Sequence, residues 1–215
     1  MQIKICGITN LEDARVAVNA GTDLIGLNFY SKSPRYIEPA RARDIAAALR
    51  ADGHAVKIVG VFVNEPSENV RAIMELVKLD LLQLHGTEPA STVSELAPRA
   101  YKALRPRDVS EARAAVAEYR NATNGHAPAF IVDAYDPKQF GGTGTRADWD
   151  IAATIARQYP ILLAGGLNSE NVADAIRIVQ PWGVDVSSGV ERAPGLKDHA
   201  KVSVFIEKAR AKSGG

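Results

Sequence analysis

The sequence is poor in several features that define common classes of protein. It contains one cysteine, Cys6, which excludes an internal disulfide and any metal site built from several cysteines. Its 26 Lys and Arg nearly balance its 25 Asp and Glu, and a net charge of +1 offers no overall attraction to nucleic acid or to an anionic membrane. No apolar run is long enough to span a bilayer. We therefore expect no nucleic-acid or membrane partner, and local groups must bind any anionic ligand.

The rest of the composition is that of an ordinary soluble protein. Hydrophobic residues make up 46% of the chain and charged residues 24%, which is enough apolar material for a large core. The first residues are typical of a strand rather than of a signal peptide, so we expect a cytoplasmic protein. Because no change of composition marks a linker, we expect a single domain over residues 1–215.

Short apolar segments rich in β-branched residues alternate with helix-like segments along the whole chain. The predicted strands cover residues 2–6, 24–28, 57–63, 81–84, 101–104, 129–133, 161–164 and 183–187. The first helix is expected to open with a capping box from Thr9 to Glu12, and the seventh with a cap at Asn168. The predicted helices run from Thr9 to near Gly21, from Pro39 to before Gly53, over 70–77, 89–96, 109–119 and 148–158, from Asn168 to before Pro181, and from Asp198 onward.

This alternation indicates βαβ units and a parallel sheet. Eight such units predict an α/β fold, a single-domain (β/α)8 TIM barrel, and 215 residues lie near the small end of that fold's range. An open doubly wound sheet is the alternative, but it usually has fewer strands and a G-x-G-x-x-G turn after the first of them. Here that turn has the sequence CGIT at residues 6–9, so the dinucleotide fingerprint is absent.

Two side chains that can carry protons stand at strand ends, where a barrel places its active site. Cys6 ends the first predicted strand and Asp133 the sixth. The alternatives are a thiol that is only a small buried hydrophobe and a carboxylate that caps a loop or pairs with an arginine. A free thiol has a pKa of about 8.5 and is mostly protonated at neutral pH. A base at Cys6 would therefore need a cation such as Arg35, or a turn N–H, to lower its pKa.

The loops after the last two strands are rich in glycine and serine. Gly165 and Gly166 follow the seventh strand, and Ser187 and Ser188 end the eighth. Barrels frequently bind phosphate at these two loops, because glycines let backbone N–H groups converge on an anion and serines add hydroxyl donors. Glycines can also merely permit tight turns. Two such loops in the two expected positions favour a phosphate site.

Two further strand ends carry possible ligand-binding side chains. Arg35 lies in the loop after the second strand and could bind a substrate carboxylate through two parallel hydrogen bonds, although a structural ion pair is equally compatible with the sequence. His85 follows the fourth strand and could carry a proton, but a hydrogen-bonding wall residue is the commoner role. The other histidines show no metal-ligand spacing, so we expect no metal.

Several motifs in the same order resemble those of the phosphoribosylanthranilate isomerase family. The resemblance runs from residue 2 to about residue 206. The matching segments are KICGIT at 4–9, QLHG at 83–86, Asp133 with GGTG at 141–144, AGGL at 164–167 and DVSSGVE at 185–191.

The resemblance implies a (β/α)8 barrel of tryptophan biosynthesis that works without a cofactor. Such an enzyme converts N-(5-phosphoribosyl)anthranilate to 1-(2-carboxyphenylamino)-1-deoxyribulose 5-phosphate by an Amadori rearrangement. It implies Cys6 as general base, Asp133 as general acid and Arg35 as the residue near the anthranilate ring and carboxylate. The family's phosphate loops correspond to Gly165, Gly166, Ser187 and Ser188, with Gly142 contributing. The expected partner is a phosphorylated small molecule, bound by a monomer or a homodimer.

Three other functions are compatible with such a barrel. The aminoaldose isomerase of histidine biosynthesis uses aspartates as both acid and base, so Cys6 argues against it. Indole-glycerol-phosphate synthase needs a catalytic lysine at a strand end, whereas Lys57 and Lys102 lie within predicted strands. A barrel that binds a phosphorylated metabolite without catalysis is the alternative from a different class.

Overall fold

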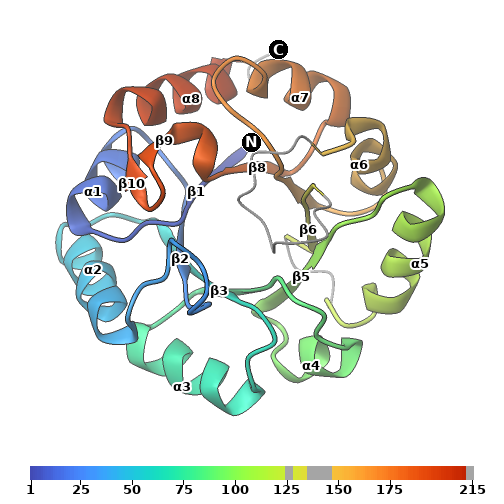
Figure 1. The fold of residues 1–215 in the computed structure, drawn as a ribbon, viewed down its shortest axis with the longest axis horizontal. Coiled ribbons are helices and arrows are strands. Elements are labelled where there is room, and N and C mark those ends of the chain that lie inside the picture. Colours follow the sequence, from blue (N-terminus) through green and yellow to red (C-terminus); the bar gives the residue numbers. More distant parts are fainter. Residues whose placement is uncertain (124–127, 135–146, 212–215) are drawn as a thin grey trace.

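The chain folds into a closed barrel of eight parallel strands, surrounded by helices. The structure is a computed structural model that describes residues 1–123, 128–134 and 147–211. Strands β1 to β8 pair in sequence order and β8 pairs with β1, so the strands form an inner ring and the helices an outer one (Figure 1). The predicted (β/α)8 barrel is thus confirmed, and the open doubly wound sheet is wrong.

The strands agree with prediction to within one residue at each end, so the expected chemical groups do lie at strand ends. The strands are β1 Gln2–Cys6, β2 Leu24–Asn28, β3 Lys57–Phe62, β4 Leu81–Leu84, β5 Ala100–Leu104, β6 Phe130–Val132, β7 Ile161–Leu163 and β8 Gly183–Val186. The helices are α1 Leu11–Asn19, α2 Pro39–Ala51, α3 Ser67–Val77, α4 Ala90–Glu95, α5 Val109–Tyr119, α6 Trp149–Ala156, α7 Val172–Val179 and α8 His199–Ala211.

Two of the predicted helix caps are wrong. Helix α1 is capped by Asn10, whose side chain accepts a hydrogen bond from the N–H of Asp13 at 2.8 Å. Thr9 is not the cap, and its hydroxyl donates to the carbonyl of Gly195, at 2.6 Å. Helix α7 begins only at Val172, because Asn168 caps a separate turn by accepting from the N–H groups of Glu170 and Asn171.

A short antiparallel hairpin follows β8 and was not predicted. It consists of β9 Glu191–Ala193 and β10 Leu196–Lys197, with Gly195 in the left-handed region at φ +78°. A 3₁₀ helix, Ser188–Val190, leads into it. The hairpin buries Glu191 and Lys197 beside the C-terminal ends of β1 and β8, so it builds part of the barrel mouth.

Side chains alternate along each strand between two apolar layers. Ile3 and Ile5 of β1 belong to the large outer core between strands and helices. Leu24, Val59 and Leu162 belong to a separate inner cluster. The opposite faces of a strand account for this division. In the described part of the chain, no helix is both long and apolar enough to cross a membrane.

The barrel interior also holds a buried ion pair. Lys4 on β1 is fully buried, and its Nζ lies 2.9 Å from Oδ1 of Asp185 on the neighbouring strand β8. Burial alone would lower the pKa of Lys4, but Asp185 raises it, and the net direction is upward. Lys4 is therefore an ammonium group inside the barrel. A buried charge is tolerated only when it is paired and hydrogen-bonded.

We predict that Lys4→Met lowers the free energy of unfolding by about 3–5 kcal/mol, because Asp185 is left as a buried charge without its partner. Urea unfolding followed by circular dichroism measures the loss. The matched control is the double variant Lys4→Met/Asp185→Leu, which removes both charges and should be more stable than the single variant. A double variant less stable than the single one would contradict this account of the pair.

Candidate active site

Cys6 lies at the C-terminal end of β1, where the register of the sheet makes room for its side chain. Its partner residue across the sheet is Gly26 of β2. A Cβ atom added to Gly26 would lie 2.7 Å from Sγ of Cys6 and 3.1 Å from Cε of Lys4. Any side chain at position 26 would thus displace the thiol. The sequence analysis missed Gly26, because a glycine inside a strand gives no local sign of what it faces.

Burial dominates the electrostatics of Cys6. It raises the pKa of the thiol, whereas the positive charge of Lys4 lowers it, and the net direction is upward. Lys197 also lowers the pKa, but Asp185 raises it. A base at Cys6 would need a cation or a turn N–H to lower its pKa. Two cations act in this direction, but desolvation of the thiolate outweighs them.

Asp133 follows β6 directly and is almost completely buried. Its backbone N–H donates to the carbonyl of Leu104 on β5, and its Oδ1 accepts from the N–H of Ala134 at 2.8 Å. Its Oδ2 lies 3.2 Å from Nε2 of His85, although the alignment is not that of a hydrogen bond. The carboxylate is thus held by its own backbone turn and faces His85.

Arg35 forms a bidentate ion pair across the barrel mouth. Its Nε and Nη2 donate to the two carboxylate oxygens of Glu191 at 2.9 and 2.8 Å. Among the residues that the structure describes, Nη1 has no acceptor. Gly7, at φ +76°, permits this arrangement, because a Cβ there would lie 2.5 Å from Cδ of Arg35. Arg35 thus forms a structural ion pair with Glu191.

Lys197 holds the same region of the barrel mouth together through hydrogen bonds. Its fully buried Nζ donates to the carbonyl of Cys6 at 2.6 Å, to that of Ser187 at 3.3 Å and to Oε1 of Glu191 at 2.9 Å. The ends of β1 and β8 are therefore joined through one ammonium group. Sequence analysis did not find this lysine, because nothing local marks a residue of a two-residue strand as buried.

Five of the predicted site residues line one hollow in the barrel mouth: Cys6, Arg35, His85, Asp133 and Ser187. The hollow has a volume of about 50 Å³. Its other walls include Asn28, Ser33, Gln83 and Asp185. Two groups that can carry protons thus border the same space as a guanidinium, which is the arrangement expected of an acid–base site.

The two loops predicted to bind phosphate lie beside this hollow and against each other. Gly165 and Gly166 both have positive φ, +82° and +63°. A Cβ at Gly189 would lie 2.0 Å from the carbonyl oxygen of Leu167, so the 3₁₀ helix after β8 packs directly on the loop after β7. Gly165, Gly166 and Ser188 do not line the hollow. Gly142 lies outside the described residues.

Several donors of these two loops have no acceptor among the described residues. Within residues 1–123, 128–134 and 147–211, the N–H groups of Gly165, Gly166 and Leu167 have no hydrogen-bond acceptor. Oγ of Ser187 is buried and likewise has no partner there. Uncommitted backbone and hydroxyl donors at adjacent loops are suited to an anion.

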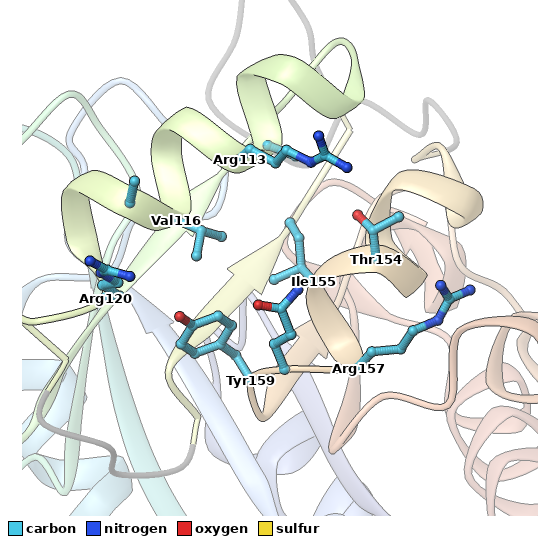
Figure 2. A pocket seen from close by; sticks show the side chains of 10 residues that line it. Arg113, Val116, Arg120, Thr154, Ile155, Arg157 and Tyr159 are labelled. Atoms are coloured by element: carbon cyan, nitrogen blue, oxygen red, sulfur yellow. The ribbon is translucent and has the colours of Figure 1, made fainter.

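A larger cavity of about 360 Å³ opens between α5 and α6, in the outer helical layer. Figure 2 shows that the guanidinium groups of Arg113, Arg120 and Arg157 lie at three separate edges of it and do not converge on one point. Ile155 and Tyr159 form part of the wall between them. No candidate residue from the sequence lines this cavity. The barrel mouth is therefore the candidate active site.

No group of three or more His, Cys, Asp or Glu side chains suited to a metal ion occurs among the described residues.

Comparison with known proteins identifies the family. The family model of N-(5'-phosphoribosyl)anthranilate (PRA) isomerase matches residues 3–208. The chain belongs to this family. It is therefore an aldose–ketose isomerase. The isomerase of Geotalea uraniireducens is 46% identical over 209 residues, which cover 97% of this chain and 98% of the relative. That of Geobacter sulfurreducens is 45% identical over 210 residues, 98% of each chain.

Solved structures agree with this family. The phosphoribosyl anthranilate isomerase of Thermotoga maritima matches this isomerase with a TM-score of 0.87 at 40% identity, over 98% of this chain and 99% of the other. A phosphoribosyl anthranilate isomerase in complex with reduced 1-(o-carboxyphenylamino)-1-deoxyribulose 5-phosphate matches with a TM-score of 0.84 at 39% identity, over 98% and 99% of the two chains.

We predict that the thiol of this isomerase reacts with iodoacetamide only at higher pH than an ordinary cysteine, because burial raises the pKa of Cys6. The alkylation rate should be measured against pH in the folded chain and in the same chain unfolded in urea. Because Cys6 is the only cysteine, the unfolded chain is a matched control. A folded profile shifted to lower pH would mean that Lys4 and Lys197 outweigh burial.

Proposed function

We propose that this isomerase rearranges N-(5-phosphoribosyl)anthranilate to 1-(2-carboxyphenylamino)-1-deoxyribulose 5-phosphate, with Asp133 as general acid, Cys6 as general base and no cofactor. The observation that carries the proposal is that a thiol and a carboxyl border the same hollow at the barrel mouth. The relative that was solved with a reduced 1-(o-carboxyphenylamino)-1-deoxyribulose 5-phosphate supports the substrate class.

The first step opens the furanose ring. The protonated carboxyl of Asp133 transfers its proton to the ring oxygen while the bond from that oxygen to C1 breaks. The lone pair of the anthranilate nitrogen forms the second bond to C1, giving a protonated Schiff base. The ring oxygen leaves as a hydroxyl group, and the transferred proton leaves Asp133 as a carboxylate anion and the Schiff base as a cation.

The second step moves a proton from carbon. The thiolate of Cys6 removes the C2 proton, and that electron pair forms the C1–C2 double bond of an enolamine while the nitrogen regains its lone pair. Proton loss from the C2 hydroxyl and protonation of C1 then give the aminoketose. Because burial raises the pKa of the Cys6 thiol, the thiol is mostly protonated before the ring opens. The Schiff-base cation formed in the first step favours the thiolate, since an opposite charge lowers an acid's pKa.

Binding groups surround these two residues. Nη1 of Arg35 is suited to the substrate carboxylate, because Nε and Nη2 are already engaged by Glu191. The phosphate is assigned to the N–H groups of Gly165 and Gly166 together with Ser187 and Ser188. The positive φ angles and uncommitted donors of the two glycines support this assignment. Gly142, outside the described residues, and His85 complete the set of proposed substrate contacts.

The alternative functions have less support from the site. The position of the catalytic base is occupied by Cys6, where the histidine-pathway isomerase would have an aspartate. Lys102 is buried and bonds the carbonyls of Leu84 and Gly86 and the carboxylate of Glu88, and it does not line the hollow. It is thus not placed as the catalytic lysine that indole-glycerol-phosphate synthase requires. A barrel that only binds a phosphorylated metabolite has no need for the paired thiol and carboxyl.

We predict that Cys6→Ser and Asp133→Asn each reduce turnover by about 10²–10⁴-fold, the range for loss of a general acid or base. The decay of fluorescence of freshly prepared phosphoribosylanthranilate measures turnover. Affinity for the reduced product analogue should change little, because both substitutions preserve shape. Wild-type turnover by either variant would show that this residue is not the proposed acid or base. Full activity in both would show that the barrel uses other groups for catalysis.

We predict that Ser187→Ala raises KM by about ten- to a hundredfold, because a hydrogen bond to a charged phosphate is worth about 1.5–3 kcal/mol. Steady-state kinetics with the same fluorescent substrate measure the effect. Ser203→Ala is the matched control, since Ser203 is exposed on α8 and bonds only its own helix. An unchanged KM in Ser187→Ala would place the phosphate elsewhere.

A further inference from the structure

A continuous chain of polar contacts crosses the barrel interior from the ion pair of Lys4 to the proposed acid. Nζ of Lys4 donates to Asp185 and, also at 2.9 Å, to Oε1 of Gln83 on β4. Nε2 of Gln83 lies 2.7 Å from Nδ1 of His85. Nε2 of His85 lies 3.2 Å from Oδ2 of Asp133. All five side chains are buried.

The ammonium group of Lys4 decides which way the Gln83 amide points. An ammonium has three donors and no acceptor, so only the amide oxygen can face it. The hydroxyl of Tyr101 also contacts this oxygen, at 2.9 Å, and can donate to it. A reversed amide would set its NH₂ group against the Lys4 ammonium at 2.9 Å and leave donors facing each other in a buried space. The NH₂ group of Gln83 must therefore face His85.

This orientation in turn decides the tautomer of His85. The amide NH₂ can only donate, so Nδ1 of the imidazole has to be the acceptor. A neutral ring with an unprotonated Nδ1 carries its proton on Nε2. That nitrogen is buried and has no hydrogen-bond partner among the described residues, and the nearest acceptor is the carboxylate of Asp133.

We propose that Lys4, acting through Gln83, fixes His85 as the Nε2–H tautomer and so makes it the positioning residue for Asp133. This role rests on the proposed function of Asp133 as the acid. When Asp133 gives its proton to the ring oxygen, the new carboxylate accepts a hydrogen bond from Nε2–H. His85 neither gains nor loses a proton in the step. Gln83 is a positioning residue that acts on Asp133 through His85, and Lys4 is one that acts through Gln83 and His85.

The tautomer can be observed directly in the full-length wild-type chain. Proton–nitrogen NMR correlation spectra with isotope-labelled histidine distinguish a protonated from an unprotonated ring nitrogen. The sequence has four histidines, and His85→Gln identifies the signals of His85 by their loss. We expect an unprotonated Nδ1 and a protonated Nε2 at neutral pH. A proton on Nδ1, or an equal mixture of both tautomers, would overturn the proposal.

Gln83→Glu is the variant that should move the proton. Both oxygens of the introduced carboxylate accept, so Lys4 can still donate to it, but Nδ1 of His85 must now carry a proton. We expect the ring proton to move to Nδ1 and turnover to fall by about tenfold or more with little change in KM, short of the roughly 10²–10⁴-fold loss for the acid itself. An unmoved ring proton, or a moved proton with wild-type turnover, would overturn the proposal.

Tyr101→Phe is the matched control, because it removes the other contact to the Gln83 oxygen but leaves the Lys4 ammonium in place. We expect the Nε2–H tautomer to persist in it. A switch to Nδ1–H would show that Tyr101, not Lys4, sets the orientation, and would overturn the proposal. Full turnover in Asp133→Asn would instead reject the acid and the positioning role, whereas the NMR result for the wild type is independent of that function.

Discussion

The structure depends on one buried charge, the ammonium group of Lys4 inside the barrel. Two charges removed from water are costly unless geometry and hydrogen bonds compensate, and here Asp185 and Gln83 both accept from Nζ at 2.9 Å. The pair occupies the interior between β1, β8 and β4, whereas other interior positions are filled by the apolar cluster that includes Leu24, Val59 and Leu162. The Lys4–Asp185 pair fixes the orientations of the polar side chains beside it, which an apolar core would not do.

The charge of Lys4 acts in different ways on the two ends of the site. Toward Cys6 it lowers the pKa of the thiol, but burial outweighs it and the net direction is upward. Toward Asp133 it acts only through the orientation of neutral groups, Gln83 and His85. In the proposed mechanism, Cys6 therefore depends on the positive charge that ring opening creates beside it, so Asp133 has to act before Cys6.

Much of this architecture was accessible from the sequence, because it follows from local periodicity. The eight strands were located to within one residue, and the proton-carrying residues Cys6 and Asp133 were found as polar groups at strand ends. Lys4 could have been found too, since it shares the inward side of β1 with Cys6, two residues away. The partner of Arg35 could not: Glu191 is 156 residues distant and is positioned by a hairpin of five strand residues that has no periodic signal. Gly26 could not have been found either, because it matters only through its close approach to the thiol of Cys6 on the neighbouring strand.

In the proposed function, the pair of Arg35 with Glu191 lets the barrel mouth bind a second carboxylate without leaving the first one unpaired. Glu191 also accepts from Nζ of Lys197 at 2.9 Å. Burial raises the pKa of Glu191, but Arg35 and Lys197 outweigh burial and hold this pKa below its ordinary value. If a substrate carboxylate draws the guanidinium toward itself, Glu191 keeps the Lys197 ammonium as partner. The desolvation penalty of an unpaired buried carboxylate is thereby avoided. A guanidinium held by two parallel bonds also keeps its plane, so a carboxylate that meets Nη1 encounters a donor whose direction is already fixed.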